Sequence, residues 1–508
     1  MRRIHAPAAP LALAVAAFSA LALAACVSAP RSERVAPPNI VLMVVDDLGW
    51  QDLSVALAPE PTEFNRRYRT PNVERLAREG MRFSQAYAAA PVCTPTRSAL
   101  LTGIAPARSH ITYWTLHAGR DTSAAFPGLL APKWNVDGVQ PGVETLPGRL
   151  RDAGYRTIHV GKAHFGAVGT SGADPLSLGF DVNVAGHGAG GPGSYYGREN
   201  FSAAGRGGDR VWDVPGLERW HGQDIYLTEV LASCAREQLE SAARSGAPFF
   251  LHFAPYAVHA PIQANPRYLA NYPDLDAREA AYATMVESYD AALGELLGAL
   301  DELDLARNTL IAFTSDNGGL SAHARGGEPH THNAPLRSGK GSCYEGGLRV
   351  PLIVRWPGVA APGSRSEALV SSADLHETLR AAGAREPQRS TRGDGLDLEP
   401  ILRGGRGDEQ RVLLWHQPHF WGVRGPGIWP FSALRRGRWK LIYRHADRAL
   451  ELYDLETDLG ESRDLSQQRP ELVRELAHEL GERLREMGAQ MSIDAASGAP
   501  VPWPDEQP

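Results

Sequence analysis

The chain has 508 residues, of which 43% are hydrophobic and 22% charged, and its formal net charge at pH 7 is −6. This composition is typical of a globular protein, and it excludes both a disordered chain and a broadly basic nucleic-acid binder. Four cysteines in a chain of this length also exclude a fold that depends on a disulfide framework.

The first 26 residues have the pattern of an export signal. Arg2 and Arg3 form a basic start, and residues 10–25 form an apolar stretch that is short for a transmembrane helix. The stretch ends in Leu-Ala-Ala before Cys26, which resembles the lipobox of bacterial lipoproteins, in which the cysteine becomes the acylated N-terminus. Signal cleavage after an alanine, with an incidental Cys26, is the alternative.

These features predict where the mature protein resides. We expect it to be exported to the periplasm or cell surface of a bacterium and to contact a membrane only through a lipid on Cys26. Residues 27–38 are polar and Pro-containing, so they are expected to form a short tether.

Between residues 39 and 404, short apolar runs alternate with helical patterns. The runs predicted to be buried strands are residues 39–45, 157–160, 249–253, 310–314 and 350–354. Helical periodicity falls between them, near residues 72–79, 95–102, 144–153, 223–243, 276–304 and 373–382. This alternation predicts an α/β domain with a large, mostly parallel sheet sandwiched by helices.

The sequence changes in character at about residue 405. Short β-like pieces at 411–415, 438–443 and 449–452 precede one long helical pattern at 470–488. Residues 405–490 are therefore predicted to form a small sheet-and-helix subdomain. Residues 491–508 are expected to be a frayed tail.

Two acidic pairs follow predicted strands. Asp46-Asp47 come directly after the run 39–45, and Asp316-Asn317 come just after the run 310–314. Because sites in parallel sheets gather beyond the carboxyl ends of the strands, these oxygen ligands could hold a hard divalent cation. The alternative is that the four residues only form turns at strand ends.

A reactive group is predicted at the start of the helix near residue 95. In the stretch Cys93-Thr-Pro-Thr-Arg97, the proline fits the first helical turn, so Cys93 lies beside the helix N-terminus and Arg97 one turn along. A nucleophile beside a guanidinium suits a tetrahedral oxyanion. A small buried cysteine before an ordinary helix is the alternative.

The Cys-x-Pro-x-Arg pattern resembles the signature of the type I sulfatases, the formylglycine-dependent members of the alkaline-phosphatase-like superfamily. Other stretches are similar to that family's motifs in order and spacing, and they occupy residues 39–50, 70–77, 155–166, 254–261, 314–319, 335–351 and 452–455. The likeness spans about residues 38–490. It implies a sulfatase catalytic domain of alkaline-phosphatase-like fold at 39–404, which would hydrolyse sulfuric esters.

The resemblance also implies roles for single residues. Five positions would bind a divalent cation, Ca²⁺ or alternatively Mg²⁺, and they are Asp46, Asp47, Cys93, Asp316 and Asn317. A separate maturation enzyme would oxidise Cys93 to Cα-formylglycine, whose hydrated aldehyde supplies the attacking hydroxyl. The residues around the sulfate would be Arg97, Lys162, His164, His259 and Lys340. Among them, His259 or Lys340 would donate a proton to the leaving alcohol, and His164 would act as the base.

The segments between the motifs are expected to decide the substrate. Residues 104–143, 183–222, 320–334 and 416–436 are rich in Gly, Pro, His and Trp. The tryptophans among them could stack on sugar rings or could only hold long loops in place, and they are Trp114, Trp134, Trp212, Trp220, Trp421 and Trp429. The histidines could contact substrate hydroxyls or only solvent, and they are His187, His221, His330 and His332. We expect a sulfated carbohydrate as substrate, with aryl sulfates as artificial ones.

Two other functions share these features. Phosphonate monoester and phosphodiester hydrolases of the same superfamily can carry the same cysteine motif and metal set. An inactive, anchored glycan-binding protein would keep the fold but lose catalytic positions, and none of those positions is lost here. Cys234 and Cys343 could pair in an oxidising compartment, or each could be a small buried side chain.

Overall fold

The structure is a computed structural model that describes residues 37–322, 325–384 and 393–506. The expected export signal, Cys26 and all but the last two residues of the tether lie outside this range. From Pro37 onward the chain folds as one compact unit. No helix in the described part of the chain is long and apolar enough to cross a membrane.

The large sheet has eight strands in the order β10-β2-β9-β8-β1-β7-β5-β6. The strands are β1 (Asn39–Val45), β2 (Met81–Phe83), β5 (Arg156–Gly161), β6 (Val182–Val184), β7 (Phe249–Ala254), β8 (Thr309–Ser315), β9 (Leu352–Arg355) and β10 (Arg365–Ser366). Five neighbours, β8-β1-β7-β5-β6, run parallel, whereas β9 runs antiparallel to both β8 and β2. The predicted α/β fold with a mostly parallel sheet is confirmed.

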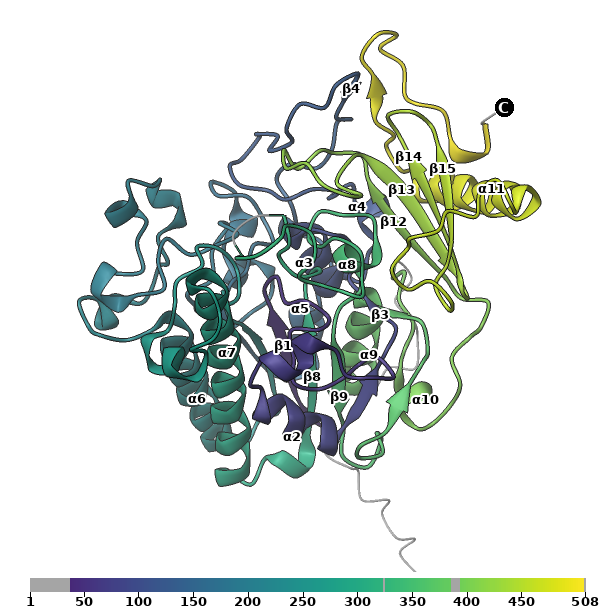
Figure 1. Cartoon of the computed structure of the whole chain (residues 1–508). Coiled ribbons are helices and arrows are strands. Elements are labelled where there is room, and N and C mark those ends of the chain that lie inside the picture. The colour runs from purple at the N-terminus through teal and green to yellow at the C-terminus, as the bar shows by residue number, and fades with distance from the viewer. Residues whose placement is uncertain (1–36, 323–324, 385–392, 507–508) are drawn as a thin grey trace, which may run out of the picture. The chain divides into compact units, whose positions relative to one another are not determined.

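Helices cover both faces of this sheet (Figure 1). One face carries α2 (Pro71–Glu79), α6 (Leu227–Ser245) and α7 (Ala277–Glu302), and the other carries α3 (Cys93–Thr102), α5 (Leu146–Asp152) and α9 (Ser372–Ala384). Because side chains alternate along a strand, Val41 and Met43 of β1 enter the first core while Leu42 and Val44 enter the second. A strand buried on both faces explains the unbroken apolar run in the sequence.

Shorter elements complete the domain. The short helices are α1 (Glu63–Arg67), α4 (Pro106–Ser109), α8 (Glu345–Leu348) and α10 (Glu399–Leu402). Two small sheets pair β3 (Ala86–Tyr87) with β11 (Val370–Ser371) and β4 (Leu129–Leu130) with β16 (Ile493–Asp494).

The C-terminal part is an antiparallel meander covered by one helix. Its strands are β12 (Val412–Gln417), β13 (Phe431–Arg436), β14 (Trp439–Arg444) and β15 (Leu450–Asp454), and its helix is α11 (Pro470–Met487). Strand β13 falls inside a segment that the sequence analysis treats as a loop. Lys440 of β14 is fully buried and pairs with Glu345 of α8 at 3.0 Å, which ties the meander to the large domain.

The expectation of a frayed tail is wrong for residues 491–506. Strand β16 pairs with β4, and Met491 and Val501 are buried in the core of the meander. The hydroxyl of Ser492 donates to the carbonyl of Pro418 at 3.1 Å. This segment is ordered because its few apolar residues are buried in the core of the meander and its backbone pairs with a strand. Its polar composition predicts neither contact.

Candidate active site

The two acidic pairs lie side by side at the carboxyl end of the sheet. Val45 of β1 is opposite Ser315 of β8, so the residues that follow leave the sheet together. The Asn317 amide donates to Oδ1 of Asp47 at 2.8 Å, and the backbone N–H of Asp47 donates to Oδ1 of Asp316 at 3.2 Å. Asp47 has a φ of 61°, a left-handed conformation that is uncommon outside glycine and is typical of functional sites.

Cys93 is the first residue of α3 and lies against these carboxylates. It is 4% exposed, and one ligand atom from each of Asp46, Asp47 and Cys93 lies within 4.8 Å of the others. The turn that leads into α3 is closed by Thr96, whose hydroxyl donates to the carbonyl of Ala90 at 3.1 Å and accepts from its N–H at 3.0 Å. The helix N-terminus therefore points backbone N–H groups toward the place where an anion would bind.

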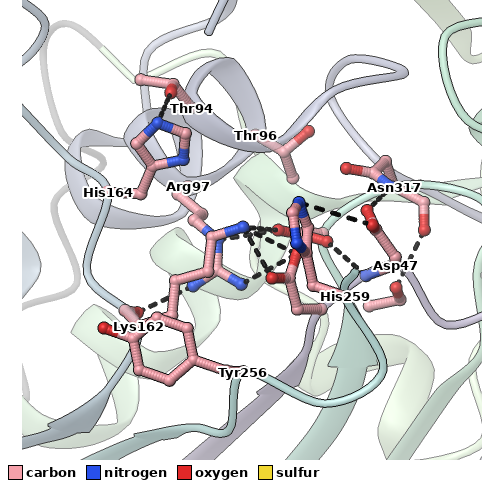
Figure 2. A network of polar contacts seen from close by, with 12 residues as sticks. Asp47, Thr94, Thr96, Arg97, Lys162, His164, Tyr256, His259 and Asn317 are labelled. Carbon is pink, nitrogen blue, oxygen red and sulfur yellow. Dashed lines mark hydrogen bonds and ion pairs between the residues drawn. The ribbon is translucent and has the colours of Figure 1, made fainter. Parts of the chain in front are cut away.

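Three buried cations each pair with one of the three carboxylates. Two of these cations, Arg97 and Lys162, are labelled in Figure 2. The N···O distances are 2.7 Å for Lys162–Asp46, 2.6 Å for Lys340–Asp47 and 2.7 Å for Arg97–Asp316. The Arg97 guanidinium also donates to the backbone carbonyl of Lys162 at 2.9 Å. The three cations and three carboxylates are buried, and a low local dielectric strengthens the interaction of each charge with a ligand.

Burial and these pairings shift the pKa values in different directions. Burial raises the pKa of Asp46 well above its ordinary value in spite of Lys162. For Asp47 burial acts in the same direction, but Lys340 and His259 outweigh it and the pKa is lowered. Burial also raises the pKa of the Cys93 thiol. An unmodified thiol at this position would thus be protonated at neutral pH and a poor nucleophile.

The two histidines are held in defined tautomers. Nε2 of His164 lies 2.8 Å from the carbonyl of Thr115, which can only accept, so we assign the proton to Nε2. Its Nδ1 has no partner among the described residues. Nδ1 of His259 lies 2.6 Å from the carbonyl of Ala260, so its proton is on Nδ1, and Nε2 is 3.8 Å from Oδ2 of Asp47. Burial lowers both pKa values, that of His259 to about 3.

Two adjacent glycines lie against these imidazole rings. A Cβ at Gly190 would be 2.6 Å from Nδ1 of His164, and a Cβ at Gly191 would be 2.8 Å from Nδ1 of His259. The sequence analysis did not identify this pair, although both glycines belong to a Gly-rich stretch in one of the segments between motifs. Thr94 was also missed, and its hydroxyl lies 3.1 Å from Nε2 of His164.

These groups face a cavity of about 180 Å³. We call five of the lining residues the floor of the cavity: Asp47, Cys93, His164, His259 and Lys340. We call the other lining residues the walls: Val92, Trp114, Gly190, Trp212, Ala260, Leu320 and Trp421. Each of the four segments between motifs contributes at least one wall residue.

The remaining aromatic candidates lie elsewhere. Trp134 packs edge-on against Tyr113, Trp220 packs against the core of the large domain, and Trp429 packs edge-on against Tyr344. Three of the six tryptophans therefore line the cavity, and the other three pack elsewhere. All four candidate histidines of these segments lie outside the cavity lining, and they are His187, His221, His330 and His332.

The spare cysteines are free in the structure. Cys234 and Cys343 are both buried and form no disulfide with each other. Cys343 is fully buried among apolar side chains of the meander and the adjoining loop, as a small packing residue would be.

The fold and the site define a hydrolase of the alkaline-phosphatase-like superfamily. Residues 38–383 match the model of the sulfatase family, and residues 339–490 match the model of the C-terminal region of N-sulphoglucosamine sulphohydrolase. The chain belongs to the sulfatase family and is a sulfuric ester hydrolase.

Individual relatives cover most of the chain. The N-acetylgalactosamine-6-sulfatase of Sus scrofa is 33% identical over 411 residues, which are 76% of this chain and 72% of the relative. A sulfatase of Formosa agariphila is 30% identical over 522 residues, or 92% of each chain. Among solved structures, Ps i-CgsB in complex with k-i-k-neocarrahexaose has a TM-score of 0.71 and 27% identity, and the match covers 88% of this chain and 93% of that one.

Proposed function

We propose that the enzyme hydrolyses a sulfate monoester of a carbohydrate by means of a formylglycine made from Cys93 and a divalent cation. The observation that carries this proposal is the set of three paired carboxylates and cations around residue 93, at the floor of a cavity with aromatic walls. The carbohydrate is supported by the relatives, one named for N-acetylgalactosamine 6-sulfate and another solved with a neocarrahexaose.

The oxygen atoms of the acidic cluster beside Cys93 fit a hard cation. Oδ2 of Asp47 and Oδ1 of Asn317 are buried acceptors without a hydrogen-bond partner among the described residues. A cation would satisfy both, and the all-oxygen set of Asp46, Asp47, Asp316 and Asn317 favours Ca²⁺, with Mg²⁺ as the alternative. When bound together with residue 93, the cation supplies positive charge that polarises a sulfate oxygen.

Formylglycine supplies a hydroxyl nucleophile at the start of α3, where the raised pKa of the thiol would give none. Arg97, Lys162 and Lys340 offset the charge of the sulfate ester and the further charge that develops at sulfur. Because these cations are fixed by ion pairs before substrate arrives, they need no reorganisation during the reaction.

The tautomers divide the proton transfers between residues. The proton of His259 is directed at Ala260, so Lys340 is the group that carries a proton toward the leaving alcohol. The free Nδ1 of His164 accepts a proton when sulfate is released from the modified residue. Formylglycine formation requires a maturation enzyme as a partner.

We also propose that the enzyme is exported and anchored by a lipid on Cys26, in the bacterial periplasm or at the cell surface. The basic start, the apolar stretch and the lipobox-like end of residues 1–26 support this. Labelling with a fatty-acid precursor should mark the wild type but not Cys26→Ala. An unlabelled wild type would overturn the anchor.

The substrate proposal is tested by sulfate release from a panel of esters. Monosulfated hexoses, sulfated oligosaccharides and an aryl sulfate are incubated with the matured enzyme, and phosphodiester and phosphonate esters serve as counter-substrates. We expect turnover of at least one sulfated sugar and none comparable of the phosphorus esters. Turnover of the aryl sulfate but of no sulfated carbohydrate would contradict the carbohydrate proposal.

A further inference from the structure

We infer that the sugar ring held in the cavity is uncharged apart from the sulfate that is removed: a neutral hexose or N-acylhexosamine, not a uronate or a ring with a second sulfate. This inference rests on the proposed function and deepens it. It concerns only the ring that carries the reacting sulfate.

The ionisable side chains of the cavity are confined to one part of its lining. Of the described residues that line it, those with ionisable side chains all belong to the floor. Lys340 is already paired with Asp47, and the two histidines direct their protons at the carbonyls of Thr115 and Ala260. The walls offer no cation for a second anionic group.

Two of the wall tryptophans, Trp421 and Trp114, are held in place by their neighbours. Trp421 lies against the backbone of Gly341, where an added Cβ would be 2.5 Å from a ring atom, and its ring centroid is 5.8 Å from Nζ of Lys340. The ring centroids of Trp114 and Tyr113 are 6.3 Å apart, and the Tyr113 ring stacks on His419 with a centroid distance of 5.1 Å. Trp421 therefore presents a supported aromatic surface directly beside the floor.

A neutral sugar ring and a charged sugar ring should differ in their free energy of binding to these walls. The C–H face of a neutral sugar replaces water on an indole surface favourably. A carboxylate or second sulfate in the same place loses its hydration and gains no partner. Selectivity for the uncharged ring thus follows from a cost imposed on the charged one as well as from stacking.

The test compares kcat/KM for methyl galactoside monosulfates with that for the matching disulfates and for a sulfated methyl uronide. We expect the best monosulfate to exceed each charged-ring analogue by roughly 100-fold, since an unpaired buried ion is strongly rejected. Equal or better turnover of a disulfate or uronide would overturn the inference. An enzyme that releases sulfate from none of these sugars and from no aryl sulfate refutes the proposed function itself, whereas an active enzyme with equal kcat/KM on neutral and charged rings refutes only the inference.

Variants at the walls give a second reading. Trp421→Ala should raise KM for the neutral sugar by roughly tenfold with little change in kcat, and Trp421→Phe should restore most of the affinity. The matched control is Trp429→Phe, which alters a tryptophan of the same segment that packs on Tyr344 instead. Trp212→Arg should reduce the ratio of kcat/KM for the monosulfate to kcat/KM for the matching disulfate. An unchanged KM in Trp421→Ala, or an unchanged preference in Trp212→Arg, would contradict the assignment of the walls.

Discussion

The floor and the walls of the cavity are built in opposite ways. Two floor residues lie at the ends of regular elements, since Asp47 comes two positions after β1 and Cys93 begins α3. The floor residues carry ionisable side chains and are mostly buried, and Asp47 and Lys340 form an ion pair. Wall residues such as Trp212 and Trp421 come from long segments between elements and are mostly uncharged and only partly buried. The difference separates the chemistry, which the sheet positions, from substrate choice, which the loops supply. Changes in the floor should therefore alter kcat, and changes in the walls should alter KM.

The largest effect is expected at Cys93. Cys93→Ala removes the nucleophile, so turnover should fall by about 10³-fold or more, while the thermal midpoint stays close to that of the wild type. Sulfate release and a melting curve measure the two quantities. Cys234→Ser, at a buried cysteine of α6, is the control and should keep its activity. Substantial turnover by Cys93→Ala would exclude residue 93 as the nucleophile.

Removing divalent cations should nearly abolish turnover and also lower the thermal midpoint. The second effect follows because buried acceptors such as Oδ2 of Asp47 and Oδ1 of Asn317 would lose their partner. A chelator followed by Ca²⁺ or Mg²⁺ tests this by calorimetry. Cys93→Ala, which keeps the four oxygen-ligand residues, should show the same shift in melting. A midpoint unaffected by chelation and by added metal would contradict the cation site.

A smaller loss is expected where the floor rests on a wall segment. Gly190→Ala would push a methyl group into the ring of His164, so kcat should fall by roughly 10- to 100-fold with a smaller change in KM. Gly205→Ala is the matched control, since it lies in the same segment and no atom lies within 4 Å of its added Cβ. If both variants had the same kcat, the backbone at Gly190 would have no part in holding His164.

The smallest effect concerns stability alone. Glu279 is buried against Arg325 at 2.8 Å, and burial is outweighed by this arginine, so the pKa of Glu279 falls from 4.5 to about 2. A lowered carboxyl pKa stabilises the fold above pH 4.5 by about 3 kcal/mol, and this contribution is lost as the pH falls toward 2.

Glu279→Gln should therefore lower the free energy of unfolding by about 2–3 kcal/mol at pH 7, and the deficit should shrink below pH 4.5. Denaturant titrations at several pH values measure it. Glu302→Gln, at an exposed pair with Arg236, should change the free energy of unfolding much less, because solvent screens the pair. A deficit for Glu279→Gln that does not change on acidification would contradict the lowered pKa.

The sequence is more informative about the acidic cluster than about the walls. Asp46, Cys93 and Asp316 each follow a strand or begin a helix, but local pattern alone also fits simple turns, and the resemblance to the sulfatase family is what grouped them into one predicted site. Which lysine pairs with which aspartate could not be predicted, because it depends on how β5 and the loop before α8 meet β1. Nor could the antiparallel direction of β9, since an apolar run carries no sign of its direction.

The walls and the C-terminal end show why the rest was out of reach. Trp421 and Trp429 lie eight positions apart in one segment, yet one lines the cavity and the other packs on Tyr344. Residue type is the same in both cases, and only tertiary packing separates them. The tail is ordered for a similar reason, because β16 finds its partner more than 350 residues away at β4.

The most direct test of the account is mass spectrometry of the tryptic peptide that carries residue 93, taken from preparations whose sulfate release has been measured. If residue 93 is the formylglycine nucleophile, the peptide shows a mass loss that matches conversion of the thiol to an aldehyde, in a fraction that rises in proportion to activity. A fully active preparation in which residue 93 is entirely an unmodified cysteine would contradict it.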